Sequence, residues 1–329
     1  MGAHPADYRT CYEGAMTRAL VLVMVVASAA RADVPNDVGA DPDRYVEQTP
    51  FVGAPRTTTP EGQPPPETAP ISLTASGFVA GYGYSHHPTR KEGVQTQVRG
   101  DVWSGLDWGA HLTYTMDVIQ ADDGRTGSYS PHSFHDLDGG GSFDLGLGIP
   151  MWVFGELHVL GGSTDYGAGA ALFGGLGIYY RKFEVELGTG VLMTSGDVGL
   201  TTSLHASRSK ITPWLGAGMT LLYTHDTPTT AIITTGGRKL AGGPELTFGP
   251  FDRFLITVDA LFGTRTFAIL QRGRVVENQP DVERTMIRML GWITLTERLR
   301  GYVGWSYRTA TAMQDYKLLS GFAGAVFNF

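Results

Sequence analysis

The chain ends in a pattern of alternating side chains that predicts a β-strand with one apolar face. Over residues 319–329, one face of an extended chain would carry only apolar or small residues: Leu319, Gly321, Ala323, Ala325, Phe327 and Phe329. The other face is mixed: Ser320, Phe322, Gly324, Val326 and Asn328. Successive side chains of a strand point to opposite faces, so this segment suits a sheet with two different surfaces.

Similar alternation recurs from Ile71 onward and predicts a β-rich body over residues 71–329. Between residues 108 and 118, one face is apolar throughout: Trp108, Ala110, Leu112, Tyr114, Met116 and Val118. The residues between them are small, polar or charged: Gly109, His111, Thr113, Thr115 and Asp117. This period of two indicates strands that are apolar on one side only. No run of about 18 apolar residues occurs in the body, which excludes transmembrane helices there.

The predicted connections between strands alternate between short and long. Short turns are predicted near residues 104–107, 149–151, 181–182, 207–210, 249–252 and 296–299. Longer connections are predicted near residues 85–93, 121–141, 161–167, 194–199, 225–236, 265–282 and 311–317. This asymmetry between the two ends gives about fourteen strands. The count is about twelve if residues 142–163 form a single irregular hairpin arm, or if residues 235–249 do not form a spanning strand.

Composition favours the same class of fold. Of the 329 residues, 45 are Gly, 42% are hydrophobic and 17% are charged. That charged fraction is below the roughly 25% of a typical soluble domain, and it fits a β-barrel whose strands alternate between lipid and lumen. A secreted β-sandwich or a soluble closed barrel is the alternative. The net charge of −7 argues against nucleic-acid binding.

A closing strand that ends in Phe at the carboxyl terminus resembles that of bacterial outer-membrane β-barrel proteins, over residues 71–329. The resemblance implies an all-β, transmembrane, antiparallel, up-and-down barrel with both termini in the periplasm. It implies outer-membrane lipid and the barrel-insertion machinery as partners, with Phe327 and Phe329 as the insertion signal. A lipid-embedded sheet has to close, because no backbone group can stay unpaired there. Aromatic residues near predicted strand ends, including Trp152 and Tyr302, fit interfacial girdles.

Residues 1–32 predict a secretory signal peptide preceded by an upstream segment. Met16-Thr17-Arg18 precedes an apolar run and a small-residue cleavage motif that ends at Ala32. This order is typical of a signal peptide, so we predict a start at Met16, cleavage after Ala32 and export in a Gram-negative bacterium. The single cysteine, Cys11, would then be lost, so no disulfide framework is expected.

Residues 33–70 predict a disordered periplasmic linker. The segment is acidic and then rich in proline, as in Gln63-Pro64-Pro65-Pro66. It has too few apolar residues to form a core, and its prolines favour an extended chain. A partner for this segment is not identifiable from the sequence.

If the apolar faces contact lipid, the alternate faces point into the lumen and carry ionisable side chains. This inward set comprises Arg99, Asp101, His111, Asp117, Asp144, Glu156, His158, Glu184, Glu186, His205, Asp259, Arg284, Arg288 and Arg308. Carboxylates dominate the earlier strands, and arginines dominate the last ones. When the sheet closes into a barrel, an acidic arc of the lumen would therefore face a basic arc. Inward glycines such as Gly175 and Gly177 favour an open or ligand-filled interior.

The lumen pattern predicts a porin-like channel for small hydrophilic or charged solutes. Two alternatives stay open: the charges pair and plug the lumen, or the barrel is a non-conducting structural or adhesin-type surface protein whose exterior loops carry the function. No G-x-S-x-G, metal-protease or P-loop motif occurs, so we expect no enzyme. A lipid-modifying enzyme with Ser and His at the exterior rim is the further alternative.

Histidines and aspartates gather in the predicted exterior loop over residues 121–141. His132, His135, Asp136 and Asp138 are the candidate metal ligands of this loop. Asp136 and Asp138 resemble the start of a calcium loop, but no acidic residue follows at the spacing that an EF-hand requires. The sequence therefore predicts no metal and no cofactor.

Overall fold

The computed structural model describes most of the predicted barrel and none of residues 1–70. The described residues are 71–104, 108–122, 129–145, 151–162, 168–180, 183–194, 197–228, 237–249, 254–269, 276–296, 298–311 and 314–329. The predicted signal peptide over 1–32 and the predicted linker over 33–70 lie outside them. Within the described ranges, no helix is long and apolar enough to cross a membrane.

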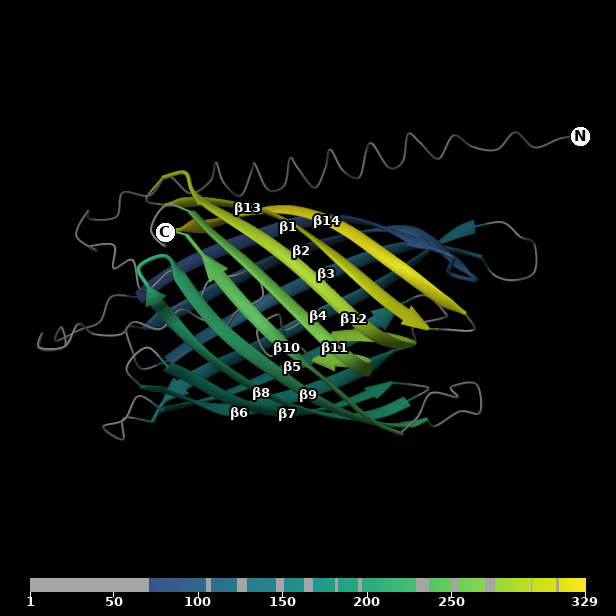
Figure 1. Cartoon of the computed structure of the whole chain (residues 1–329), viewed down its shortest axis with the longest axis horizontal. Helices are drawn as coiled ribbons and strands as arrows, with labels where there is room; N and C mark the ends of the chain where they lie inside the picture. The colour runs from purple at the N-terminus through teal and green to yellow at the C-terminus, as the bar shows by residue number, and fades with distance from the viewer. Residues whose placement is uncertain are drawn as a thin grey trace, which may run out of the picture. The chain divides into compact units, whose positions relative to one another are not determined.

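Fourteen strands close into one antiparallel barrel (Figure 1). They are β1 (Ile71–Ser85), β2 (Arg90–Ser104), β3 (Trp108–Asp122), β4 (Tyr129–Asp144), β5 (Met151–Gly162), β6 (Gly169–Tyr180), β7 (Phe183–Thr194), β8 (Asp197–Thr212), β9 (Leu215–Pro228), β10 (Gly237–Phe248), β11 (Phe254–Ile269), β12 (Val276–Thr294), β13 (Leu299–Thr311) and β14 (Asp315–Asn328). Each strand pairs with its sequence neighbours, and β1 also pairs with β14. The predicted closed barrel of fourteen strands is confirmed, and the twelve-strand alternative is wrong.

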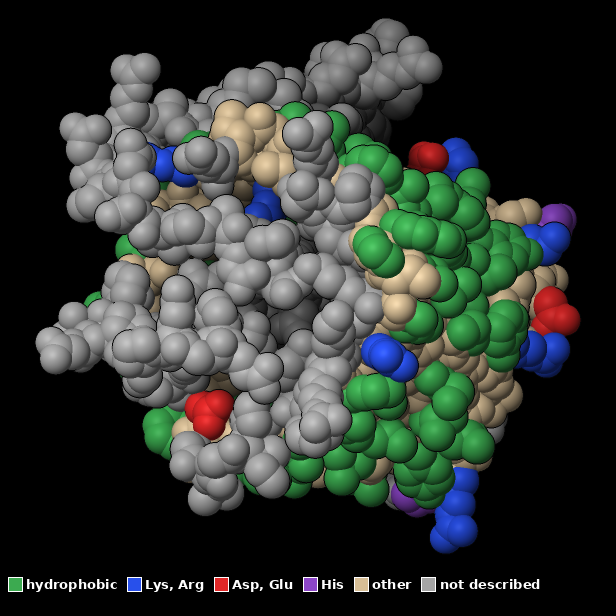
Figure 2. Space-filling view, turned by 60° about the vertical axis from the view of Figure 1, so that its left-hand side comes forward, with side chains coloured by type: hydrophobic (Ala, Val, Ile, Leu, Met, Phe, Trp, Pro, Cys, Tyr) green, Lys and Arg blue, Asp and Glu red, His purple; other side chains and the backbone are tan. Residues whose placement is uncertain are grey.

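Large apolar side chains cover the outer face of the barrel wall. Leu112, Leu172, Leu240 and Val303 come from four different strands, and each is between 61% and 63% exposed. Figure 2 shows hydrophobic side chains gathered over a broad area of the surface. An extended apolar surface on a folded protein indicates contact with a partner or a membrane.

The predicted long loop over residues 121–141 is wrong. Tyr129–Asp144 forms β4, which pairs with β3 over its whole length, from Trp108↔Phe143 to Asp122↔Tyr129. The alternation is weak here because the face of β4 that carries Leu137 also carries Ser133 and His135. The predicted turn at 207–210 is wrong as well, because β8 continues to Thr212.

Inward-facing aromatic rings lie over glycines of neighbouring strands. Trp152 on β5 is opposite Gly177 on β6, where an added Cβ would lie 2.0–2.6 Å from the indole. Tyr302 on β13 lies over Gly324 on β14 in the same way. The space beside these glycines is therefore filled by aromatic rings and is not open. Trp152 and Tyr302, at 7% and 3% exposure, are interior residues and do not belong to an interfacial girdle.

Candidate functional site

Most of the ionisable residues predicted to face the lumen occupy the inward positions of the barrel wall. Arg99, His111, Glu156, His158, Glu184 and His205 are each 8% exposed or less. A second group occupies equivalent positions with partial exposure: Asp101, Asp117, Asp144, Glu186, Asp259, Arg288 and Arg308. The alternation of side chains thus places a polar, ionisable surface inside a barrel whose outside is apolar.

Arg284 departs from the predicted inward set because of a β-bulge. The β12–β13 register changes from Glu283↔Ala310 to Thr285↔Thr309, so Arg284 is an extra residue on β12. A bulge shifts the alternation of the strand. The Glu283 side chain is therefore 5% exposed, whereas Arg284 is 56% exposed and its Nη2 lies 3.9 Å from Oδ1 of exposed Asp315. The expectation that Arg284 faces the lumen is wrong.

The inward arginines near the end of the chain pair with carboxylates on adjacent strands. Arg288 Nε donates to Asp259 Oδ1 at 2.8 Å, and Arg308 Nη1 donates to Glu283 Oε1 at 3.3 Å. Arg265, which the sequence analysis missed, also pairs with Glu283. Much of the positive charge predicted as a basic arc is therefore matched within the wall itself.

Acidic side chains outnumber basic ones on the inward face of the described residues. The acidic members are Asp101, Asp117, Asp136, Asp138, Asp144, Glu156, Glu184, Glu186, Glu245, Asp259 and Glu283. The basic members are Arg90, Arg99, Lys239, Arg265, Arg288, Arg300 and Arg308. With all of these ionised, the inward face carries a negative balance.

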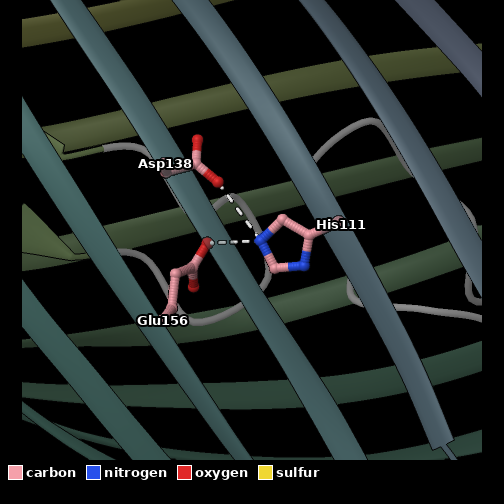
Figure 3. Close-up of side chains that lie close together, drawn as sticks. All are labelled: His111, Asp138 and Glu156. Carbon is pink, nitrogen blue, oxygen red and sulfur yellow. Dashed lines mark hydrogen bonds and ion pairs between the residues drawn. The ribbon is translucent and has the colours of Figure 1, made fainter.

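A buried cluster occupies the wall formed by β3, β4 and β5, and Figure 3 shows three of its members, His111, Asp138 and Glu156. His111 Nε2 lies 3.2 Å from Asp138 Oδ1 and 3.2 Å from Glu156 Oε1. All three side chains are at most 3% exposed. The imidazole of His111 therefore connects two carboxylates that come from the next two strands.

His158 and Asp136 extend this cluster on β4 and β5. His158 is directly opposite Asp138 in the strand register. Its Nδ1 lies 3.1 Å from Asp136 Oδ2, and its Nε2 lies 3.7 Å from Glu156 Oε1. The His158 side chain is fully buried, and its Nε2 has no hydrogen-bond partner among the described residues.

A glycine between the two outer strands makes the cluster possible. Gly140 on β4 pairs with His111 on β3 and with Glu156 on β5. An added Cβ at Gly140 would lie 2.8 Å from His111 Cε1 and 3.0 Å from Glu156 Cα, closer than side chains normally approach. Because position 140 carries no side chain, His111 reaches across β4 to the Glu156 carboxylate.

The four residues that the sequence suggested as metal ligands do not lie together in the structure. Asp136 and Asp138 are buried at 4% and 1% exposure and belong to the cluster. His135 stacks on Tyr114, and its Nδ1 lies 2.8 Å from the Tyr114 hydroxyl. His132 contacts the hydroxyl of Ser130 at 3.1 Å. The candidates do not form the exterior loop site that the sequence suggested.

The interior also contains two apolar clusters. One joins strands on either side of the β1–β14 seam: Phe78, Ala80, Leu255, Leu290, Trp292, Tyr302 and Val326, with Phe322 packed against it. The other lies on β4 to β7: Leu160, Ala171, Phe173 and Leu192, with Phe134 and Phe154. The inward surface is therefore mixed rather than uniformly polar.

Comparisons with known proteins identify a fold and no family. No protein-family model and no curated protein matches the chain. Among solved structures, the CymD monoaromatic hydrocarbon channel matches with a TM-score of 0.53 and 7% identity, over 79% of this chain and 88% of that one. The TodX deltaS2S3 mutant monoaromatic hydrocarbon channel matches with a TM-score of 0.50 and 8% identity, over 78% and 90%.

An outer-membrane protein of Acinetobacter baumannii, Omp33, matches less well. Its TM-score is 0.42 at 9% identity, over 78% of this chain and 99% of that chain. The two matches with the higher TM-scores, together with the closed fourteen-strand sheet, show that the chain has the fold of bacterial outer-membrane β-barrel proteins. At these identities the likeness concerns the fold alone.

Proposed function

We propose that this protein spans the bacterial outer membrane and passes small solutes through the interior of its barrel. The apolar outer face supports the membrane location, since the lipid-facing residues of such barrels are apolar and the inner ones polar. The comparisons support a channel in that two similar structures are described as hydrocarbon channels. No motif in the sequence favours an enzyme. That the protein has no enzymatic activity stays a prediction.

The proposed orientation places both ends of the barrel in the periplasm. β1 begins and β14 ends at the same rim, where Thr74 pairs with Asn328. In this orientation the chain that precedes residue 71 would serve as the periplasmic linker. Phe327 and Phe329 would then contact the barrel-insertion machinery from the periplasmic side.

We propose that the channel prefers cations, and the acidic majority on the inward face is the observation that carries this proposal. Side chains that face the lumen tune the selectivity of transmembrane barrels, and rings of Asp or Glu favour cations in channels generally. The solutes would be small hydrophilic or positively charged molecules, in line with the porin-like prediction. The two apolar clusters would add contacts for solutes that have an apolar part.

A non-conducting structural barrel is the second candidate. It is favoured by the burial of inward side chains such as Phe173, Leu222 and Thr201, each at 1% exposure or less. An interior as densely packed as this around every strand would leave no path for a solute. Measurement of ion currents separates the two candidates.

Substitution of Arg288 by Glu should increase the preference for cations. The change removes the positive partner of Asp259 and adds a second negative charge beside it. A change of two unit charges about 8 Å from a passing ion alters its energy by about 1 kcal/mol in water, or about fivefold in relative permeability. The reversal potential of a planar bilayer under a KCl gradient measures this ratio.

Arg284→Glu is the matched control for this experiment. The two arginines lie on the same strand, but Arg284 is exposed beside Asp315. We expect its reversal potential to equal that of the wild type. Equal reversal potentials for Arg288→Glu and the wild type would contradict the proposed selectivity.

A further inference from the structure

The cluster on β3, β4 and β5 has the donor atoms of a transition-metal site. It offers one imidazole nitrogen, His111 Nε2, and two carboxylates, Asp138 and Glu156, with a second imidazole, that of His158, beside Glu156. One donor atom from each of His111, Asp138 and Glu156 lies within 4.8 Å of the others. The same holds for Asp136, Asp138 and His158. Imidazole and carboxylate together are ligands that Zn²⁺ accepts readily.

The distances between these donors fit a tetrahedral ion. Zn²⁺ binds nitrogen and carboxylate oxygen at about 2.0–2.2 Å, so two ligand atoms of a tetrahedron lie about 3.4 Å apart. The separations here are 3.2 Å from His111 Nε2 to Asp138 Oδ1, 3.2 Å from His111 Nε2 to Glu156 Oε1, and 3.7 Å from His158 Nε2 to Glu156 Oε1. His111 Nε2, Asp138 Oδ1 and Glu156 Oε1 are thus near coordination geometry without a change of strand register, and His158 Nε2 lies beside Glu156.

His158 and Asp136 support this site from the next inward positions of β5 and β4. His158 Nδ1 lies 3.1 Å from Asp136 Oδ2, and His158 Nε2 lies 3.7 Å from Glu156 Oε1. Residues that contact the ligands of a metal in this way fix the orientation of those ligands.

The cluster also gathers negative charge. Asp136, Asp138 and Glu156 bring three carboxylates into a site whose side chains are at most 6% exposed, where they face the imidazoles of His111 and His158. Three carboxylates at one buried place favour a cation there, since buried charges are normally paired or coordinate a metal.

We propose that His111, Asp138 and Glu156 bind one Zn²⁺ ion, with His158 beside Glu156 and Asp136 as the residue that orients His158. Three protein ligands leave one position of a tetrahedral shell for a water molecule. The ion would join three consecutive strands and neutralise the carboxylates inside the wall. This site is independent of solute transport, and it would exist in a barrel that conducts nothing.

The test uses the untagged full-length chain, folded in detergent micelles, treated with a chelator and then titrated with Zn²⁺ by calorimetry. We expect one Zn²⁺ per chain and an increased thermal unfolding temperature, because metal binding is coupled to folding. Co²⁺ in place of Zn²⁺ should give the strong visible absorption of a tetrahedral complex. A folded barrel that binds no Zn²⁺, or Co²⁺ bound with the weak spectrum of an octahedral complex, would overturn the proposal.

Four single variants locate the ion. His111→Gln removes a ligand and should abolish the stoichiometric site. His158→Gln and Asp136→Asn keep every ligand and should each weaken binding by about 10–100-fold, as loss of an orienting partner does. His205→Gln is the control, since His205 is an equally buried inward histidine that contacts Thr220 at 3.0 Å, on other strands.

The pattern across these variants decides the outcome even if one of them does not fold. Heat-modifiable mobility in gel electrophoresis reports which variants form a barrel. The proposal holds if His205→Gln binds like the wild type and the folded cluster variants do not. Wild-type affinity in folded His111→Gln, His158→Gln and Asp136→Asn would contradict it. Zn²⁺ binding by the wild type that His205→Gln abolishes would place the ion elsewhere.

Discussion

Leu157→Arg is expected to lower the free energy of unfolding in lipid vesicles by about 2–4 kcal/mol, the cost of Arg at the middle of a bilayer. Leu157 is the seventh residue of β5 (Met151–Gly162), and its side chain is 51% exposed on the outer face. In the proposed membrane setting it would lie near the bilayer midplane. The measurement is equilibrium unfolding by urea of the chain folded into phosphatidylcholine vesicles.

Leu73→Arg is the control for depth in the membrane. Leu73 is the third residue of β1, at the rim of the barrel, and it is 49% exposed. Arg near the interface costs about 0–1 kcal/mol. The same small cost at both positions would mean that the outer face does not lie in a bilayer, because a soluble barrel has no depth dependence.

Gly324→Ala should destabilise the barrel by about 1–3 kcal/mol, the usual cost of overpacking. Its Cβ would lie 2.3 Å from the carbonyl oxygen of Gly77 on β1 and 2.3 Å from Tyr302 Cζ on β13. The Tyr302 hydroxyl donates to that same carbonyl oxygen at 3.1 Å. The methyl group would therefore disturb the seam where β14 closes the barrel onto β1. Urea unfolding in vesicles measures the loss.

Gly321→Ala lies on the same strand and provides the comparison. An added Cβ there meets no atom within 4 Å, so we expect a change of no more than about 0.5 kcal/mol. Equal stability of Gly324→Ala and Gly321→Ala would show that the inward glycines are not needed to hold aromatic rings.

The terminal strand shows how far the alternation of side chains predicts this fold. The face with Leu319 is exposed and the face with Val326 is buried, as the pattern over 319–329 predicts. Residues 108–118 behave in the same way. A period of two is sufficient to predict a strand and its two faces where the outer face is consistently apolar, because the outer residues are then apolar and the inward residues are mostly polar or small.

β4 and Arg284 show where the alternation of side chains fails to predict the structure. β4 presents Ser133 and His135 on the face opposite its buried aspartates, so its sequence resembles a loop although β3 pairs with it throughout. The bulge at Arg284 inserts one residue and exchanges the two faces of β12. One extra residue does not alter the composition, and the alternation alone does not identify the residue at which the two faces exchange.

The candidate metal cluster needed the strand register as well as the side-chain faces. The sequence places His111, Glu156 and His158 on inward faces, but it does not state which residues lie opposite one another. The register brings Asp138 beside His158, and Gly140 lets His111 reach Glu156, which is 45 residues away in the chain. These contacts depend on pairing between strands rather than on any local motif.

The current through a planar lipid bilayer shows whether this barrel is a channel. The full-length wild-type chain, shown to be folded by heat-modifiable gel mobility, is added to one side under a KCl gradient. We predict stepwise increases in conductance and a reversal potential whose sign shows that K⁺ is more permeable than Cl⁻. Folded protein that inserts into the bilayer and never carries current would contradict the account and favour the non-conducting structural barrel.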